Sequence, residues 1–414
     1  MEDISCSVTK CRICKVANLE VVIDFGEMAL TGVFASNGKE VPRAPLILMR
    51  CKECGLVQLA HSYDLDRLYG ESYGYESHLN QSMISHLHSK ARILEEKYLS
   101  FDKPIILDIA SNDGTFLAGF SRNDLIKVGI DPLIEVVSNC YPQDTLKIAD
   151  FFSKEIYFAN MNEQCQLVTS MSVLYDLDNP RKFVSDIADI LAEEGIWHFE
   201  QSYLPTMVQT LSYDTVCHEH LLYLSLHDIS KLLTDSGLQI LEVSLNSTNG
   251  GSIAVTAIKT KKTISMHPFV KFLLDKEIEE GYQNGDKLRE FANRAELHRT
   301  ALLKLLRDLK ISGSKIVGLG ASTKGNVLLQ WLQLDEDLLE RIGDVNSRKF
   351  NKRTPGSDIL IVDEKEIIDG ANEKTIAVVL PWHFRDGIII RSEALLAKGG
   401  SLLFPLPGIE IVSN

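Results

Sequence analysis

The sequence has no long apolar run, no low-complexity segment and no close internal repeat. A membrane-spanning helix needs about 20 mostly apolar residues, so we expect no membrane span. The first ten residues, MEDISCSVTK, are acidic and polar, unlike a secretory signal, in which a basic segment precedes an apolar one. These absences favour a soluble, cytoplasmic protein.

Positive charge is also scarce. The 414 residues include 43 Lys and Arg against 57 Asp and Glu, which gives a net charge of −14. Such an acidic chain is a poor match for nucleic acid or an anionic membrane, so we expect neither as a partner. At about 150 residues per domain the length predicts two to three domains. We expect the protein to be a monomer or a homodimer.

Eight cysteines are present, but a large chain without a secretory signal does not indicate a disulfide framework. Four of them form two C-x-x-C pairs, which can supply the four thiolates of a closed zinc site: Cys11, Cys14, Cys51 and Cys54. The alternatives are unligated buried cysteines or a redox motif, and neither pair opens a helix after a strand as a redox motif would. We expect zinc to organise a small N-terminal module of few apolar residues, without Cys6 or His61 as ligands.

The hydrophobic pattern changes along the chain. Short apolar runs and turns occupy 1–68, and from residue 104 short apolar strands alternate with amphipathic helices, which is typical of a doubly wound α/β sheet. The segments 239–245 and 251–259 are expected to pair antiparallel at its edge. We therefore predict an α/β protein with these parts: a zinc-binding module at 1–68, a Rossmann-like domain at 69–262, a helical linker at 263–310 and a smaller Rossmann-like domain at 311–414.

The first strand of the larger domain leads into the turn of LDIASNDGTFL (107–117). Ligands of open α/β sheets bind outside the carboxyl ends of strands, and small residues there allow the backbone to approach closely. The turn is not G-x-G-x-x-G, so it is a poor match for a dinucleotide. The candidate ligand-binding residues of this turn are Asp108, Ser111, Asn112, Asp113 and Gly114.

Two more acids end the following strands. Asp131 can bind both hydroxyls of a ribose, and Asp150 with Phe151 can contact an adenine. Three acids at successive strand ends, Asp108 included, suit an amino acid, a ribose and an adenine together, as in S-adenosylmethionine (SAM). The alternative is that these acids only cap helices or carry surface charge.

A cluster of ionisable residues, His218-Glu219-His220, lies between the fifth strand and the next helix. It can bind a metal or act as a base with its orienting carboxylate. Residues two apart in an extended segment point the same way, so His218 and His220 could form a metal pair, but no third ligand is evident. The alternative is a pair of surface histidines.

The smaller domain begins with KIVGLGASTKGN (315–326), a strand, a glycine-rich turn and the start of a helix. Free N–H groups at such a turn bind anions, but it is not a G-x-x-x-x-G-K-[ST] loop, so nucleotide hydrolysis is not expected. Asp344 is expected in the same cleft, and the alternative is a domain that acts only as a wall. The candidate substrate contacts are Gly320, Ser322, Thr323, Lys324, Asn326, His383 and Arg385.

The whole chain resembles the sugar C-methyltransferases of deoxysugar pathways. The matching segments are CRIC, CKECGLVQL, YGYESHLNQSM (73–83), LDIASNDGTF, DTVCHEHLLYLSL, GLGASTKGN, LPWHFRD (380–386) and LFPLPGIEI (403–411). The resemblance implies three domains, structural zinc on the four cysteines, SAM as cofactor and a nucleotide-linked 4-keto sugar as substrate.

It also implies roles for single residues. His220 matches the general base at the sugar carbon, with Glu219 beside it as an orienting acid. Tyr75 and Asn80 lie in a segment that lines the cofactor and sugar pockets, and Tyr75, His218 or a backbone N–H are candidates to stabilise an enolate oxygen.

The chain departs from the family pattern at two places. Many members have Tyr where this chain has Cys217, and many have a histidine in the loop that here reads Tyr175-Asp176. Both changes affect the sugar side of the site. An O- or N-methyltransferase of another small metabolite, an RNA-binding zinc protein and a non-catalytic binding protein remain alternative functions.

Overall fold

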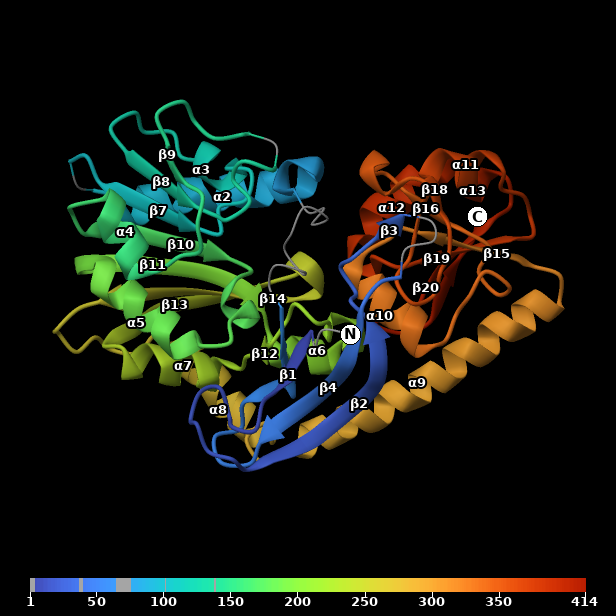
Figure 1. The fold of residues 1–414 in the computed structure, drawn as a ribbon, viewed down its shortest axis with the longest axis horizontal. Helices are drawn as coiled ribbons and strands as arrows, with labels where there is room; N and C mark the ends of the chain where they lie inside the picture. Colours follow the sequence, from blue (N-terminus) through green and yellow to red (C-terminus); the bar gives the residue numbers. More distant parts are fainter. Residues whose placement is uncertain (1–3, 37–39, 65–75, 101, 138) are drawn as a thin grey trace.

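The computed structural model describes residues 4–36, 40–64, 76–100, 102–137 and 139–414 (Figure 1). Three main sheets and the helices that cover them form an α/β protein, as the sequence predicts. The expected boundary at 68/69 lies outside the described residues.

The central sheet has seven strands in the order β13-β14-β11-β10-β7-β8-β9. The five strands from β11 to β9 are parallel, and β14 and β13 form the expected antiparallel pair at one edge. All five residues of β7 are buried, as in a strand covered on both faces. The strands are β7 (Ile105–Ile109), β8 (Ile126–Ile130), β9 (Leu146–Ile148), β10 (Cys165–Met171), β11 (Leu191–Ser202), β13 (Leu238–Asn246) and β14 (Ser252–Lys259).

Helices flank this sheet (Figure 1), and short 3₁₀ turns lie in its connecting segments. The helices are α2 (Gln81–Tyr98), α3 (Thr115–Ala118), α4 (Lys154–Asn160), α5 (Pro180–Ile190), α6 (Leu204–Gln209) and α7 (Leu226–Asp235). The 3₁₀ turns are η1 (Ser77–Leu79), η2 (Leu174–Asp176), η3 (Tyr213–Thr215) and η4 (Thr248–Gly250).

The amino-terminal sheet is antiparallel, with strand order β12-β5-β4-β2. Three strands come from the first 60 residues, but β12 follows the His218-Glu219-His220 turn. The expectation of a module with few apolar residues is wrong, because Leu46, Leu48 and Leu56 are fully buried in the apolar cluster that also holds the central sheet. The strands are β2 (Leu19–Ala29), β4 (Arg43–Cys51), β5 (Val57–Leu59) and β12 (Leu222–Tyr223), beside a small pair, β1 (Ser5–Ser7) and β6 (His61–Tyr63).

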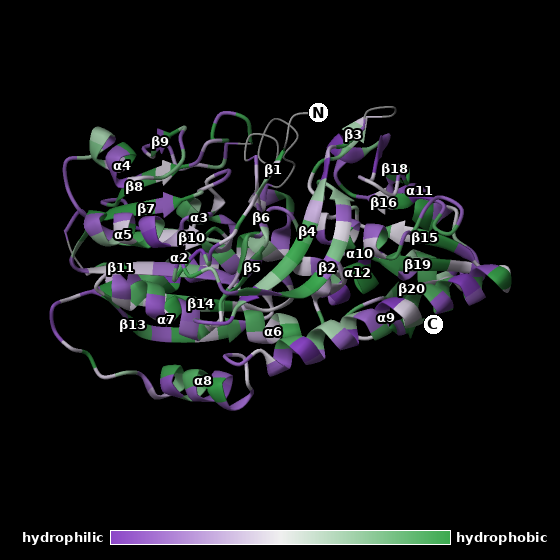
Figure 2. Cartoon of the chain, turned by 60° about the horizontal axis from the view of Figure 1, so that its bottom comes forward, coloured by the Kyte–Doolittle hydropathy of each residue, from purple (hydrophilic) through white to green (hydrophobic). Residues whose placement is uncertain are grey.

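Two helices, α8 (Pro268–Glu279) and α9 (Asp286–Ile311), follow the central sheet where a helical linker is expected. The long helix α9 buries Leu288, Phe291, Ala295, Leu302 and Leu306, at spacings that place them on one face. Polar and apolar residues alternate along it (Figure 2). Within the described residues, no helix combines the length and the apolar character needed to cross a membrane.

The carboxy-terminal sheet has the order β18-β16-β15-β19-β20-β21, parallel except for β21. Its strands are β15 (Lys315–Leu319), β16 (Ile342–Asp344), β18 (Ile361–Asp363), β19 (Thr375–Val379), β20 (Ser401–Phe404) and β21 (Glu410–Val412). Its helices and 3₁₀ turns are α10 (Thr323–Trp331), α11 (Glu364–Asp369), α12 (Arg385–Arg391), α13 (Glu393–Ala397), η5 (Ser347–Lys349) and η6 (Trp382–Phe384). The short strand β17 (Lys352–Arg353) pairs with β3 (Ala35–Ser36) of the amino-terminal region.

Candidate functional site

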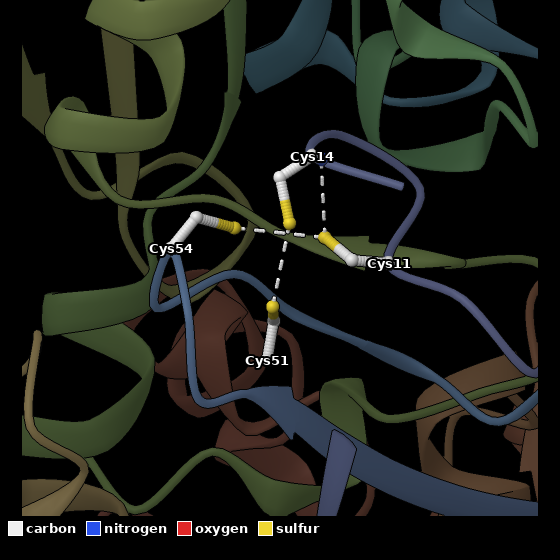
Figure 3. Close-up of side chains that lie close together, drawn as sticks. All are labelled: Cys11, Cys14, Cys51 and Cys54. Carbon is white, nitrogen blue, oxygen red and sulfur yellow. Dashed lines mark hydrogen bonds between the residues drawn. The ribbon is translucent and has the colours of Figure 1, made fainter. Parts of the chain in front are cut away.

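The four predicted zinc ligands come together (Figure 3). The sulfur atoms of Cys11 and Cys54 are 3.5 Å apart, those of Cys14 and Cys51 are 3.6 Å apart, and all four lie within 4.8 Å of one another. A tetrahedral zinc ion with Zn–S bonds of about 2.3 Å separates its sulfurs by about 3.8 Å. The spacing and the all-sulfur donor set therefore fit zinc.

Each C-x-x-C pair forms the same tight turn. The N–H of Lys15 donates to the carbonyl of Cys11, and the N–H of Gly55 donates to that of Cys51, both at 3.0 Å. Lys15 and Gly55 both have positive φ, 63° and 86°. These turns bring two sulfurs to the same side of the backbone, and the hydrogen bond from Cys54 lowers the pKa of the Cys11 thiol to about 5.

Arg12, between two zinc ligands, ties the metal site to the central sheet. It is 2% exposed, donates to the carbonyl of Leu59 at 2.6 Å and pairs with Asp178 at 3.0 Å. Asp178 lies just beyond η2, which carries Tyr175. The zinc site and the segment that packs on His220 are therefore held together.

At the carboxyl edge of the central sheet, Asp131 closes the turn after β7. Its carboxylate accepts the N–H of Asn112 at 2.9 Å and that of Leu133 at 2.7 Å, and burial raises its pKa. Asp108 is 3% exposed and accepts a hydrogen bond from Thr169 Oγ1 at 2.7 Å. Burial raises the pKa of Asp108 to about 7, which does not support the expectation of an open carboxylate that holds an amine.

The turn after β7 needs Gly114, but for a different reason than expected. Gly114 has φ +84°, and a Cβ there would lie 2.4 Å from the ring of Tyr141. The Tyr141 hydroxyl lies 2.7 Å from Ser111 Oγ and donates to the carbonyl of Asn112 at 2.8 Å. The close approach at Gly114 is thus made by Tyr141, a residue that the sequence pattern does not single out.

Asp113 connects the same turn to the carboxy-terminal part of the chain. It is fully buried and lies 2.9 Å from His78 Nδ1. Burial opposes ionisation, but hydrogen bonds from Thr115 and His78 hold the pKa of Asp113 below its usual value. Glu76 lies 3.6 Å from the same His78 nitrogen and forms an ion pair with Arg348 of η5.

The other predicted cofactor contacts do not lie in the turn after β7. Asp150 and Phe151 are exposed, and Asp150 accepts the N–H of Phe151. Asn80 caps α2 by accepting the N–H of Ser82 at 3.0 Å. Tyr75 lies outside the described residues.

The His218-Glu219-His220 segment is a turn closed by the His220 N–H and the Cys217 carbonyl, 3.1 Å apart. The expectation that His218 and His220 point the same way is wrong, because the segment is not extended. His218 is fully buried, packs edge-on against the ring of Tyr63 and has its pKa lowered by burial to about 4. This position does not support a metal pair, or contact of His218 with a substrate oxygen.

Glu219 lies against the loop after β2. Thr31 Oγ1 donates to its carboxylate at 3.2 Å, and burial raises the pKa of Glu219. A Cβ at Gly32 would lie 2.1 Å from Glu219 Oε1 and 3.7 Å from Thr323 Oγ1. Residues of all three sheet regions therefore meet at Gly32.

We expect Gly32→Ala to destabilise the protein, because the new methyl group overlaps the Glu219 carboxylate, which is buried and would have to leave its hydrogen bond from Thr31. Overpacking of this kind costs about 1–3 kcal/mol, measurable as a lower thermal midpoint and a lower urea midpoint. The matched control is Gly387→Ala in α12, where no atom lies within 4 Å of the added methyl. A thermal midpoint of Gly32→Ala equal to that of Gly387→Ala would contradict the packing.

His220 ends the turn that begins at Cys217, and its ring contacts η2 and η3. Its Nδ1 is 3.0 Å from the carbonyl oxygen of Thr215, and its ring centroid is 4.4 Å from that of Tyr175. Because a carbonyl only accepts, Nδ1 carries the proton and Nε2 is the basic nitrogen. Burial and then the ammonium of Lys324 lower the pKa of His220 to about 3.

A small cavity is lined by His220 and by aromatic and apolar side chains. Tyr175, one of the two departures from the family pattern, is among them, so this departure lies beside His220. Cys217, the other departure, is fully buried. The lining residues are Tyr175, Ser202, Tyr203, Leu204, Met207, Thr215, His220, Leu222 and Tyr223.

In the carboxy-terminal sheet, the glycine-rich turn forms as expected. Gly320 has φ +80°, with Pro381 where a Cβ would lie, and Ser322 caps α10 by accepting the N–H of Gly325 at 3.0 Å. Asp344 takes the N–H of Ala321 at 2.8 Å, so its carboxylate holds the turn in place. Thr323 begins α10.

The remaining predicted substrate contacts divide into two groups. Asn326 is fully buried and donates to the carbonyl of Thr31 at 2.7 Å, and Arg385 pairs with Glu410 at 2.6 Å. Both contacts join parts of the chain, so the expectation that Asn326 and Arg385 face the substrate is not supported. His383, in contrast, has a buried Nδ1 without a hydrogen-bond partner in the described part of the chain.

Sequence reasoning missed Asp214. It is 1% exposed, accepts a hydrogen bond from Trp382 Nε1 at 2.8 Å, and burial raises its pKa to about 6. The available signal was its place six residues before His220, in the same DTVCHEHLLYLSL segment. It links η3 to η6, far apart in the sequence.

Comparison with known proteins agrees with this arrangement. Family models match residues 11–69 as a zinc binding domain, 75–243 as a methyltransferase domain and 247–407 as a C-methyltransferase C-terminal domain. The C-methyltransferase NovU of Streptomyces niveus is 26% identical over 418 aligned positions, which cover 100% of this chain and 99% of the relative.

Solved structures are similar over less of the chain. Magnesium protoporphyrin IX methyltransferase from Synechocystis PCC 6803, with bound SAM, is 14% identical and covers 42% of this chain and 79% of its own, with a TM-score of 0.31. The plantazolicin methyltransferase BpumL is 13% identical over 43% of this chain and 83% of its own, with a TM-score of 0.34. The three consecutive family domains and the full-length relative show that this chain is a SAM-dependent methyltransferase with a C-methyltransferase C-terminal domain.

Proposed function

We propose that this C-methyltransferase acts on a nucleotide-linked 4-keto sugar, at a carbon next to the ketone, with His220 as the base. The observation that carries the proposal is which ring nitrogen of His220 carries its proton. Its Nδ1 lies 3.0 Å from the Thr215 carbonyl and carries the proton, so Nε2 is the nitrogen free to accept one.

Carbon attacks a methyl donor only as a carbanion or enolate, and a neighbouring ketone makes its proton removable. A neutral imidazole with a fixed tautomer is suited to accept that proton. Tyr175 packs on the ring and Thr215 fixes its orientation, so the protein's contribution is to hold base and carbon in reacting geometry.

We place SAM at the turn after β7, where Asp131 would hold the ribose hydroxyls and Ser111, Asn112 and Gly114 form the backbone turn. Bound SAM supplies an electrophilic methyl group. For the nucleotide we propose the turn at Gly320, Ser322 and Thr323, because the first N–H groups of α10 attract phosphate.

The test is incubation of the full-length protein with SAM and a panel of nucleoside-diphosphate-linked 4-keto sugars, followed by mass spectrometry. We expect a gain of one methyl group on one sugar, and loss of one deuterium when the carbon next to the ketone is labelled. Methylation with full retention of that deuterium would instead support an O- or N-methyltransferase. If no sugar nucleotide is methylated, the proposal is wrong.

A further inference from the structure

Lys324 is a partly exposed residue whose ammonium contacts another part of the chain. It occupies the first turn of α10, and its Nζ donates to the carbonyl of Asn249 in η4 at 2.7 Å. Among the described residues it forms no ion pair within 4 Å, and burial lowers its pKa against the opposing effect of Asp214. An ammonium held by a single carbonyl keeps two N–H donors for another group.

Its surroundings are the groups next to His220. The helix α10 packs against η3, whose Thr215 carbonyl fixes the His220 ring. The ammonium is close enough to lower the pKa of both His220 and His383. The Lys324 ammonium therefore lies near His220, although Lys324 is part of the carboxy-terminal sheet region and His220 is part of the central one.

Two polar atoms of this cluster lack partners. Asp214 Oδ1 and His383 Nδ1 are both buried and have no hydrogen-bond partner within the part of the chain that the structure describes. Their neighbours come from two sheets: Trp382 donates to Asp214 Oδ2, and Gly250 lies against Trp382 and His383, where an added Cβ would be 3.3 Å and 3.7 Å away. Buried polar atoms without partners are costly, so this junction is suited to a polar ligand.

A phosphate anchor explains this position poorly. A positive charge beside a base weakens the base, which is a cost without benefit to proton removal if the ammonium holds only a phosphate of the nucleotide. The same charge is useful if it meets the negative charge that proton removal creates, because preorganised donors in a buried site stabilise developing charge strongly.

We propose that Lys324 is a catalytic residue of the proposed reaction, where its ammonium binds the ketone oxygen of the substrate and stabilises the enolate. His220 Nε2 takes the proton from the carbon next to the ketone. The C–H electron pair becomes the C=C bond of the enolate, and the C=O pair moves onto oxygen, which accepts hydrogen bonds from Lys324. When the enolate carbon takes the methyl group from SAM, the C=O bond forms again and S-adenosylhomocysteine leaves. This role replaces the phosphate contact that the sequence motif predicts.

The test separates proton removal from methyl transfer. Full-length wild type and Lys324→Met are mixed with S-adenosylhomocysteine and an accepted 4-keto sugar nucleotide in D₂O, and deuterium uptake next to the ketone is followed by mass spectrometry. We expect Lys324→Met to slow uptake and kcat by about 100-fold or more, the usual effect of removing one oxyanion donor. The Kd of the nucleoside diphosphate should stay within threefold of wild type.

Lys324→Arg keeps the charge and should recover part of the exchange rate, and Lys365→Met, which changes an exposed lysine of α11, is the matched control. Exchange by Lys324→Met within threefold of wild type would overturn the inference while the proposed function stands. Loss of nucleoside-diphosphate binding in proportion to activity would also overturn it, in favour of a phosphate anchor. A wild type that neither exchanges nor methylates any 4-keto sugar nucleotide overturns the proposed function and this inference together.

Discussion

His220→Gln is expected to lower kcat by about 10³-fold, because the side chain that accepts the proton is lost while the size of the site is nearly kept. General-base groups contribute about 10²–10⁴-fold to rate, and the fixed tautomer at Thr215 indicates a well-positioned base. The measurement is the rate of methyl transfer to the accepted sugar nucleotide, with the affinity for S-adenosylhomocysteine measured in parallel and expected to be unchanged.

His227→Gln, a change at the start of α7, is the matched control and should keep wild-type activity. Retention of activity within fivefold by His220→Gln would remove His220 as the base. The pH profile gives a second check. Because burial lowers the pKa of His220 to about 3, we expect protonation of this histidine to cause no loss of rate between pH 8 and pH 5. Any loss in that range is expected from Asp214, whose pKa burial raises to about 6, and it should disappear in Asp214→Asn.

Cys51→Ser is expected to abolish stoichiometric zinc binding and to lower the thermal midpoint on the order of 10 °C, since metal binding and folding are coupled. Cys51 is fully buried and begins the turn that leads into β5. We also expect activity to fall with zinc content, because Arg12 joins the metal site to the segment that carries Tyr175. Zinc is measured by atomic absorption on the purified protein.

Cys6→Ser is the matched control, because Cys6 is exposed and outside the four-cysteine cluster. It should keep one zinc per chain and the wild-type thermal midpoint. A Cys51→Ser protein that retains one tightly bound zinc would show that the four cysteines are not the ligands.

Local patterns predicted most of the fold. The buried strands of the central sheet are contiguous apolar runs, so β7 and its neighbours could be located from sequence within a few residues. Strand β12 has only two residues and pairs with β5, from the start of the chain, and no local pattern reveals such a partner.

In the site, too, local features could be predicted from sequence and contacts between distant segments could not. The zinc ligands could be predicted because two C-x-x-C turns are local structures. The orientation of His218 could not, since a turn at Cys217 reverses the alternation that an extended segment has. The place of Lys324 depends on the packing of α10 against η3, a contact between two sheets whose sequence motifs are read separately.

The shared amino-terminal sheet constrains how this enzyme can be recombined with its relatives. Because β12 supplies an edge strand to β5, a chimaera joined near residue 70 would pair one parent's β5 with the other parent's β12. The same junction would separate Thr31 from the Glu219 that it contacts. Exchange of substrate preference by domain shuffling therefore requires residues 217–223 to travel with the first 64 residues, as a set that is discontinuous in the gene.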